Sequence, residues 1–241
     1  MKLALRAGKH VIDDPVASLR RLQGTAPRLS AAPQMSEQSP SSPYTGGLYF
    51  DHLPSTPKDE LVLEDLGVTL LLSSRVAWRA CLSILELGST LRGLSEIGNT
   101  PLEESTVEER NKVSSVIAEV AGWNGFRVSV ATKILHKKRP NLIPVLDNQA
   151  IFTAFMGAKP PERLGSAIET FNQDNRKVIE VLDSIQLDLN SPENEESWLA
   201  LKAIEPNRTR IQLFDMVWWS WFPENVAPQS NKELARKPRK L

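Results

Sequence analysis

The sequence predicts an all-α fold, in a single multi-helix domain flanked by disordered tails. Apolar residues recur at helical spacing through most of the segment 44–225, as in the stripe Val113, Val116, Ile117 and Val120. Patterns typical of strands are almost absent from the sequence, and no internal repeat is visible. A chain of 241 residues is long enough to bury one sizeable hydrophobic core.

Both ends of the chain differ in composition from the predicted domain. The segment 1–43 includes a long stretch rich in Ser, Pro and Ala without periodicity, so we expect it to be mostly disordered. A short helix is predicted at 14–23, because Asp14 can cap it and Pro15 suits its first position. The segment 226–241 is basic and polar and is also expected to be disordered.

Composition limits the classes of function. The formal net charge is zero, with 29 Lys and Arg against 29 Asp and Glu, so attraction to nucleic acid or membranes has to come from local patches. One cysteine and three scattered histidines exclude a disulfide framework and give no metal-site spacing, and we expect neither a metal nor a cofactor. No apolar run reaches the roughly 20 residues that span a bilayer. We therefore expect a cytoplasmic protein without a membrane partner.

The segment 122–147 has the pattern of a turn, a helix and a proline stop. The turn contains an Asn-Gly pair ending at Gly125, and glycine adopts positive φ without steric cost. The helix is expected to begin near Val128, and Pro140 prevents its continuation. Asp147 then stands directly before another apolar helical pattern. We expect the remaining helices to hold this hairpin–helix unit in place.

Two further helix starts have recognisable signals. Ser105 and Glu108 have the spacing of a capping box at the helix that leads into the hairpin–helix unit. Ser191, Pro192 and Glu193 combine a cap, a first-turn proline and an acid that matches the helix dipole. These signals predict one helix just after each motif.

A basic cluster occupies the end of the predicted central helix. Like charges four residues apart weaken a helix slightly, so an anionic partner would account for them. Phosphate backbone is the natural candidate, and DNA is the partner we expect. The alternative is a solvated basic face that acidic helices balance elsewhere. The cluster consists of Lys133, Lys137, Lys138 and Arg139.

Three stretches resemble the DUF6308 family of uncharacterised bacterial proteins. They are Y-T-G at 44–46, the run A-T-K-I-L-H-K-K-R-P-N-L-I-P-V-L-D at 131–147, and L-F-D-M-V-W at 213–218. This resemblance would cover most of 44–222. The shorter segment 125–152 also resembles the helix-hairpin-helix DNA glycosylases, which have a glycine hairpin, a helix, and an aspartate at the head of the next helix.

The glycosylase resemblance implies roles for individual residues. The hairpin corresponds to Gly125-Phe126-Arg127, and the position of the lysine nucleophile in bifunctional members falls on Ser129. Asp147 falls on the catalytic aspartate, which would stabilise an oxocarbenium ion or activate water. Because Ser129 has no amine, lyase chemistry is not expected. Arg127 replaces the second glycine, so its side chain rather than a backbone nest would contact phosphate.

Two functions from different classes follow. The first is a DNA-binding protein related to base-excision DNA glycosylases, on their all-α scaffold, with monofunctional or lost N-glycosidic activity. Whether the chain is an enzyme stays open. The catalytic candidates are Asp147 and Ser129. The nucleic-acid-binding candidates are Gly125, Arg127, Lys133, Lys137, Lys138 and Arg139.

The second function is a non-enzymatic all-α module that kept the scaffold and binds another protein. Its contact surface would be formed by Trp218, Trp219 and Trp221, whose alternative role is core packing. Asp147 also has a simpler role, the capping of the helix that follows it. An open cleft that Asp147 shares with Arg127 or Lys133 would favour the first function.

Overall fold

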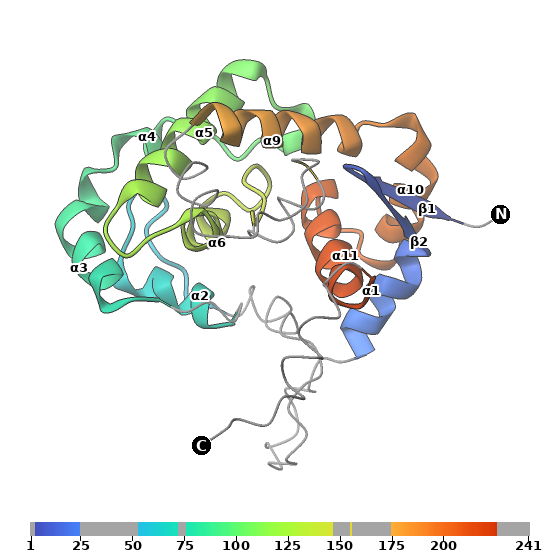
Figure 1. The fold of residues 1–241 in the computed structure, drawn as a ribbon, viewed down its shortest axis with the longest axis horizontal. Helices are drawn as coiled ribbons and strands as arrows, with labels where there is room; N and C mark the ends of the chain where they lie inside the picture. Colours follow the sequence, from blue (N-terminus) through green and yellow to red (C-terminus); the bar gives the residue numbers. More distant parts are fainter. Residues whose placement is uncertain (1–2, 25–52, 72–75, 147–154, 156–174, 226–241) are drawn as a thin grey trace, which may run out of the picture.

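The computed structural model describes residues 3–24, 53–71, 76–146, 155 and 175–225, and these are mostly helical (Figure 1). This confirms the predicted helical class, with the addition of one small sheet. The N-terminal elements are β1 (Ala4–Ala7), β2 (His10–Asp13), α1 (Pro15–Gly24), η2 (Leu63–Leu66), α2 (Gly67–Leu71), α3 (Trp78–Leu87), η3 (Gly88–Thr90) and α4 (Arg92–Ser95). The later elements are η4 (Leu102–Glu104), α5 (Val107–Gly122), α6 (Val128–Lys138), α9 (Asn175–Leu189), η6 (Pro192–Asn194), α10 (Glu195–Ile204) and α11 (Arg210–Asn225).

The elements form two groups that α9 connects (Figure 1). Helices α2 to α6 make one group, with α6 at its centre. The β1–β2 hairpin, α1, α10 and α11 make the other, in which α1 packs against α10 and α11. Helix α9 packs along α5 and also contacts β1. Helices α6 and α11 therefore face the junction between the two groups.

A hairpin at the N-terminus belongs to the folded core. Strands β1 and β2 pair antiparallel, with Ala4 opposite Asp13, and Gly8 in the two-residue turn has φ +57°. Leu5 and Ile12 point into the core and are fully buried. Asn194 fixes the hairpin, since it accepts from the N–H of Arg6 at 2.7 Å and donates to the carbonyl of Arg6 at 3.1 Å.

Helix α1 matches the helix predicted at 14–23. The Asp14 carboxylate accepts a hydrogen bond from the N–H of Ala17 at 2.9 Å, as expected of a cap. Leu19 and Leu22 are buried in the group formed with α11. The folded unit thus includes the hairpin and α1, whereas the sequence analysis placed its start at residue 44. Residues 25–43 and 226–241 lie outside the described part of the chain.

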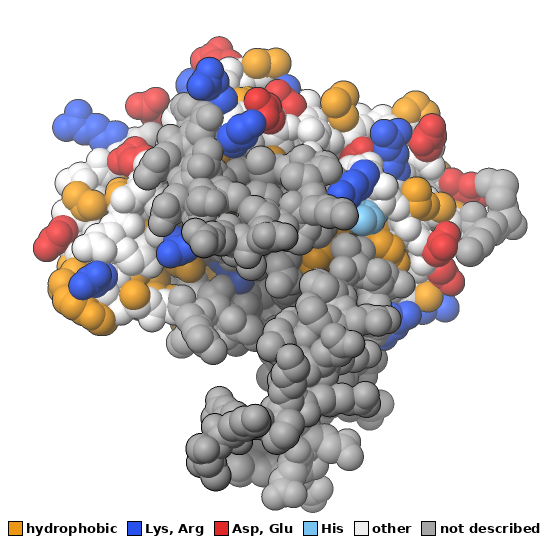
Figure 2. Space-filling model, in the orientation of Figure 1, with side chains coloured by type: hydrophobic (Ala, Val, Ile, Leu, Met, Phe, Trp, Pro, Cys, Tyr) orange, Lys and Arg blue, Asp and Glu red, His pale blue; other side chains and the backbone are white. Residues whose placement is uncertain are grey.

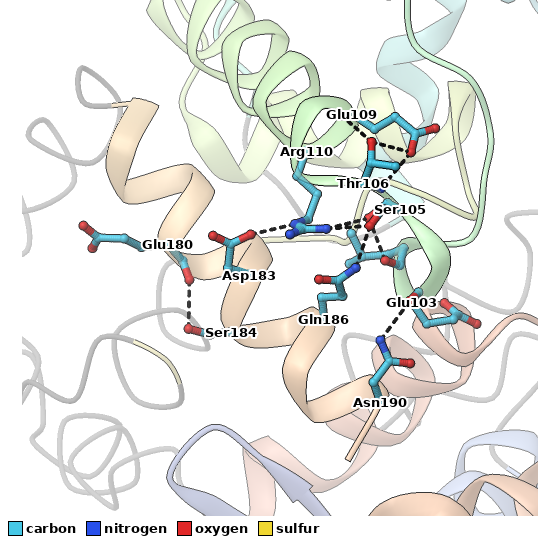
Figure 3. Close-up of polar contacts among 11 residues, drawn as sticks. Glu103, Ser105, Thr106, Glu109, Arg110, Glu180, Asp183, Ser184, Gln186 and Asn190 are labelled. Carbon is cyan, nitrogen blue, oxygen red and sulfur yellow. Dashed lines mark hydrogen bonds and ion pairs between the residues drawn. The ribbon is translucent and has the colours of Figure 1, made fainter. Parts of the chain in front are cut away.

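Polar contacts join α5 to α9 and to the segment around η4 (Figure 3). The Arg110 guanidinium donates to the Asp183 carboxylate at 2.6 Å and to the Ser105 carbonyl at 2.6 Å. Gln186 of α9 donates to the same carbonyl at 2.7 Å, and Asn190 donates to the carbonyl of Glu103 at 2.8 Å. The buried Arg110 guanidinium is thereby paired, and η4 is tied to α9 and the residue that follows it.

The capping box of α5 is shifted by one residue from the prediction. Thr106 is the cap, and its hydroxyl accepts from the N–H of Glu109 at 3.2 Å. Glu109 in turn accepts from the N–H of Thr106 at 2.8 Å (Figure 3). Ser105 instead donates its hydroxyl to the Leu102 carbonyl at 2.7 Å. The sequence motif is compatible with a cap at Ser105 or at Thr106. Because the Ser105 hydroxyl bonds to Leu102 of η4, Thr106 is the cap.

Aromatic side chains fill the core around α11. Trp218 is almost fully buried and stacks on Phe214, with a ring-centroid distance of 6.1 Å and an interplanar angle of 5°. Trp221 and Phe222 surround the same ring. No helix within the described ranges is long and apolar enough to cross a membrane.

Candidate functional site

The turn before α6 packs closely against α3. Gly125 has φ +87°, and a Cβ at this position would come within 2.4 Å of the backbone nitrogen of Ala80. The Ser83 hydroxyl donates to the Asn124 carbonyl at 2.9 Å, which ties the turn to α3. Both the backbone conformation and the close approach therefore require glycine. Arg127, which precedes α6, is exposed.

Helix α6 begins at Val128, as predicted, and ends before Pro140. Arg139 at its end has φ −136° and ψ +67°, outside the helical region, because the following proline disfavours it. Basic side chains in the last turn suit the partial negative charge of a helix C-terminus. At a rise of 1.5 Å per residue, Arg127 and Arg139 lie about 18 Å apart along the axis. The turn thus lies at the opposite end of α6 from Lys137, Lys138 and Arg139, while Lys133 lies between them.

The fully buried Asp65 binds two lysines of α6. Its Oδ2 lies 2.6 Å from Nζ of Lys138, and its Oδ1 lies 3.4 Å from Nζ of Lys137. The carboxylate also accepts from the Thr56 hydroxyl at 2.6 Å and the Val62 N–H at 2.9 Å. Burial lowers the pKa of Lys138, while the hydrogen bond and charge of Asp65 oppose that shift. Two of the predicted phosphate ligands therefore have an internal carboxylate partner.

The buried Arg139 side chain bridges three segments of the chain. It donates to the carbonyls of Leu94 and Ile97, each at 2.8 Å, and to the carbonyl of Lys58 at 2.9 Å. Its Nη2 also lies 2.7 Å from the Asp59 carboxylate. A planar guanidinium with five donors suits this arrangement. Arg139 holds the end of α6 to its surroundings.

A cavity of about 710 Å³ lies between α6, α11 and the segment 53–59. Exposed residues such as Ser95 and Asn99 line one part of it, so it reaches the surface. Several of its lining side chains are buried, and we call four of these, Lys133, His136, Asp215 and Trp219 of α6 and α11, the floor of the cavity. Among the described residues, six cations and two carboxylates line it: Lys58, Lys133, Lys137, Lys138, Arg139 and Arg208, with Asp59 and Asp215.

Asp215 and His136 meet on the floor of the cavity. Oδ2 of Asp215 accepts a hydrogen bond from the N–H of Val145 at 3.1 Å and lies 4.0 Å from Nδ1 of His136. Nδ1 lies 2.6 Å from the carbonyl of Ile143, which can only accept, so this nitrogen carries a proton. Burial raises the pKa of Asp215 to about 8, and the Val145 N–H opposes the shift. Near neutral pH, Asp215 is mostly a carboxylic acid.

The structure separates the residues that the sequence analysis grouped together. Lys133, Lys137, Lys138 and Arg139 line one cavity, whereas Gly125, Arg127 and Ser129 are absent from its lining. Ser129 is half-buried in the first turn of α6. Asp147, the predicted catalytic carboxylate, lies outside the described residues. Within the described ranges, no three His, Cys, Asp or Glu side chains are grouped to hold a metal ion.

Two of the tryptophans predicted as a partner surface are buried. Trp218 is in the core, Trp219 is buried on the cavity floor, and Trp221 is half-buried against the core. The sequence reasoning missed Asp215 and His136 as site residues. The signal for Asp215 was an acid within the apolar run L-F-D-M-V-W, where a helix would bury it.

A protein-family model matches residues 33–221, which include α6 and most of α11. It is described as a family of unknown function, DUF6308. The chain belongs to this family. Neither the curated proteins nor the solved structures give a match. The segment assigned to DUF6308 contains Asp65, the basic cluster and Asp215, while the β1–β2 hairpin and α1 precede it.

Proposed function

We propose that this protein binds nucleic acid, with phosphate held at the cavity between α6 and α11. The observation that carries the proposal is the excess of cations on the cavity lining, six against two carboxylates among the described residues. The whole chain has no net charge. Figure 2 shows positive and negative side chains interspersed on the described surface of one face. The concentration of cations at one concave place therefore favours an anionic ligand.

Three of the six cations have internal carboxylate partners. Asp59 pairs with Arg139, and Asp65 serves both Lys137 and Lys138. Asp215 contributes little negative charge near neutral pH because its pKa is raised. Lys58 is exposed and Arg208 half-buried on the same lining. Lys58 is therefore the cation on this lining that is most accessible to a phosphate.

The dimensions of the cavity suit a single nucleotide unit. Ligand pockets typically measure about 300–1,000 Å³, and this cavity falls within that range. Proteins that act on or inspect a base extrude one nucleotide into such a pocket. A cavity with an exposed edge and a buried floor fits this mode of binding. Trp219 on the floor adds an aromatic surface for a base.

A finer proposal is that the protein derives from base-excision DNA glycosylases, with monofunctional or lost N-glycosidic activity. It rests on the sequence resemblance at 125–152 and on Asp147 as the candidate carboxylate. Two parts of the pattern that this resemblance implies, a glycine turn and a following helix, are observed, while its aspartate, Asp147, lies outside the described residues. Ser129 in place of a lysine continues to argue against lyase chemistry.

The test is fluorescence anisotropy with two labelled duplexes, one intact and one carrying a stable abasic-site analogue, at two salt concentrations. We expect tighter binding to the analogue, because a missing base removes the cost of extrusion. Lys58→Ala should make the slope of log K against log salt less steep by about one, the change expected when one phosphate contact is lost. Lys112→Ala is the matched control, since Lys112 lies on α5, pairs with Glu108 and is absent from the cavity lining.

Arg127→Ala distinguishes the two ends of α6. An unchanged salt slope in this variant supports binding at the cavity. A reduced slope in Arg127→Ala with no change in Lys58→Ala would move the contact to the turn. If neither duplex binds at low salt, the nucleic-acid proposal is overturned.

One observation favours the second candidate, a protein-interaction module. Helix α3 exposes Trp78, Leu82 and Leu85, which are 67%, 44% and 65% exposed and share one helical face. Such a stripe is typical of a helix that packs against another chain. If Trp78→Ala abolishes association with a partner while Lys58→Ala does not, this second function is supported.

A further inference from the structure

We propose that Asp215 forms a subsite that donates a hydrogen bond to an uncharged acceptor on a planar ring of the bound ligand. This inference rests on the proposed function and names the part of a nucleotide that the cavity floor recognises. The ring would be a nucleobase, whose carbonyl oxygen or ring nitrogen accepts. The phosphate would remain at the cationic part of the lining.

The hydrogen bonds of Asp215 leave one carboxyl oxygen for a ligand. Both of its described polar contacts, with the Val145 N–H and with Nδ1 of His136, are made by Oδ2. The described structure gives Oδ1 no hydrogen-bond partner. An acid that accepts at Oδ2 can carry its proton at Oδ1. Because Asp215 lines the cavity, this O–H group is placed to donate to what enters it.

The surroundings explain why the proton is retained. Asp215 is 8% exposed. The side chain that could pair with Asp215 as a cation is His136, whose Nδ1 lies 4.0 Å from Oδ2, too far for a hydrogen bond. The Nδ1 proton of His136 is directed to the Ile143 carbonyl instead. Burial without a bonded cation favours the neutral acid. Asp65 differs, because it is fully buried but lies within 3.4 Å of two lysine ammonium groups.

Apolar neighbours indicate a ring rather than a phosphate at this subsite. Val145, Met216 and Trp219 line the cavity together with Asp215. A phosphate there would lose its hydration beside an acid that becomes negative at higher pH. An uncharged heterocycle loses little on burial and gains one hydrogen bond from the O–H group. A site that donates this bond would also reject rings that lack the acceptor.

Other titratable groups face the same space and must be separated from Asp215 in any test. Lys133, His136, Lys137, Lys138 and Arg139 line it from α6 and its end, and burial lowers the pKa of Lys138. Arg208 stands before α11, and Lys58 and Asp59 belong to the segment 53–59. Asp215→Asn separates Asp215 from all of them, because it leaves these groups unchanged. Histidine ordinarily titrates below about pH 7.5 and arginine stays charged. Cytidine monophosphate keeps constant charge between about pH 7 and pH 9, so it is a suitable probe.

The experiment is calorimetric titration of the full chain with cytidine monophosphate and with ribose phosphate, at about pH 7 and pH 9. With a pKa of about 8, the protonated fraction of Asp215 falls about tenfold between these values, so affinity for cytidine monophosphate should fall about tenfold. Ribose phosphate, which has no base, should change less than about twofold. Asp215→Asn keeps an N–H donor that does not titrate, so its affinity should change little with pH.

Asp188→Asn is the matched control. Asp188 is 7% exposed, accepts a hydrogen bond from the N–H of Gly8, and has a pKa raised by burial, but it holds the hairpin and is absent from the cavity lining. This variant should retain the wild-type pH dependence. Equal pH dependence for both probes, or persistence of the loss in Asp215→Asn, would overturn the subsite.

A third arm separates this inference from the nucleic-acid proposal. A duplex with one mismatched pair, whose base is easily extruded, is titrated under the same conditions. The Asp215 effect is a loss of affinity between about pH 7 and pH 9 that Asp215→Asn removes. If cytidine monophosphate shows this effect but the duplex does not bind, the subsite is supported and the nucleic-acid proposal is overturned. If the duplex binds with no Asp215 effect, nucleic-acid binding stands and the subsite fails. If no probe binds, both are overturned.

Discussion

Two buried aspartates show how neighbours decide the state of a carboxyl group. Asp65 is fully buried beside Lys137 and Lys138, and it also accepts two hydrogen bonds. Asp215 has one backbone donor and a histidine at 4.0 Å. The first is a structural ion pair, and the second has its pKa raised to about 8. Only the second has the properties expected of a group that exchanges protons or hydrogen bonds with a ligand.

Asp215→Asn should stabilise the protein more at alkaline than at acidic pH. The folded state keeps the Asp215 proton up to about pH 8, whereas the unfolded chain loses it near its ordinary value of 3.8. The folded state therefore binds more protons between these values, and this group's contribution to stability falls as pH rises through that window. Between about pH 4 and pH 9, the difference in unfolding free energy between variant and wild type should grow by more than about 1.4 kcal/mol, the equivalent of one pKa unit. Urea denaturation at both pH values measures it, and a pH-independent difference would contradict the assignment.

Gly125→Ala should lower the free energy of unfolding by about 1–3 kcal/mol, because alanine is strained at positive φ and its Cβ would meet the α3 backbone. Gly122→Ala is the matched control, three residues earlier, where a Cβ meets nothing within 4 Å. That change should be neutral or slightly stabilising, since alanine favours helix. Thermal unfolding of the two variants compares them. Equal effects would show that the turn is not held against α3.

At the scale of elements, the end of α6 is held by side chains that the sequence presents as a surface charge cluster. The spacing of basic residues is visible in the sequence, but their partners are not. Asp65 and Asp59 are about 70–80 residues away in the chain, and periodicity carries no information about such pairs. The start of α6 at Val128 was predictable because turn, helix and proline signals are local.

Arg139→Ala should destabilise the protein by about 2–4 kcal/mol, because it leaves the buried carbonyls of Leu94 and Ile97 and the partly buried carbonyl of Lys58 without their donor. Arg139→Lys should recover only a part, since one ammonium cannot reproduce the planar fork. The exposed Arg127 provides the control, and Arg127→Ala should change stability by less than about 0.5 kcal/mol. Chemical denaturation tests the series. A full recovery by lysine would contradict the bridging role.

The N-terminal hairpin shows why short strands are difficult to predict from a sequence. Each strand has four residues, too few for a reliable alternating pattern. Their burial depends on Asn194 and Asp188, which bond to the backbone of Arg6 and Gly8 from about 180 residues away. The shift of the capping box has a similar cause, because η4 engages Ser105 and leaves Thr106 to cap α5.

At the scale of the whole molecule, the candidate site is a product of the junction between two helical groups. Its lining combines the segment 53–59, the end of α6 and the beginning of α11, which are far apart in the sequence (Figure 1). The sequence identified the basic cluster and the L-F-D-M-V-W run separately. Only the fold brings Asp215 and Trp219 to the same cavity as that cluster.

Hydrogen–deuterium exchange with and without the abasic-analogue duplex tests the central claim most directly, because it locates the ligand as well as detecting it. Binding at the cavity predicts slower amide exchange in peptides that cover the end of α6 and the beginning of α11, with little change in α3. Protection confined to the turn at 124–127 or to α3, or no protection at saturating duplex, would contradict the claim.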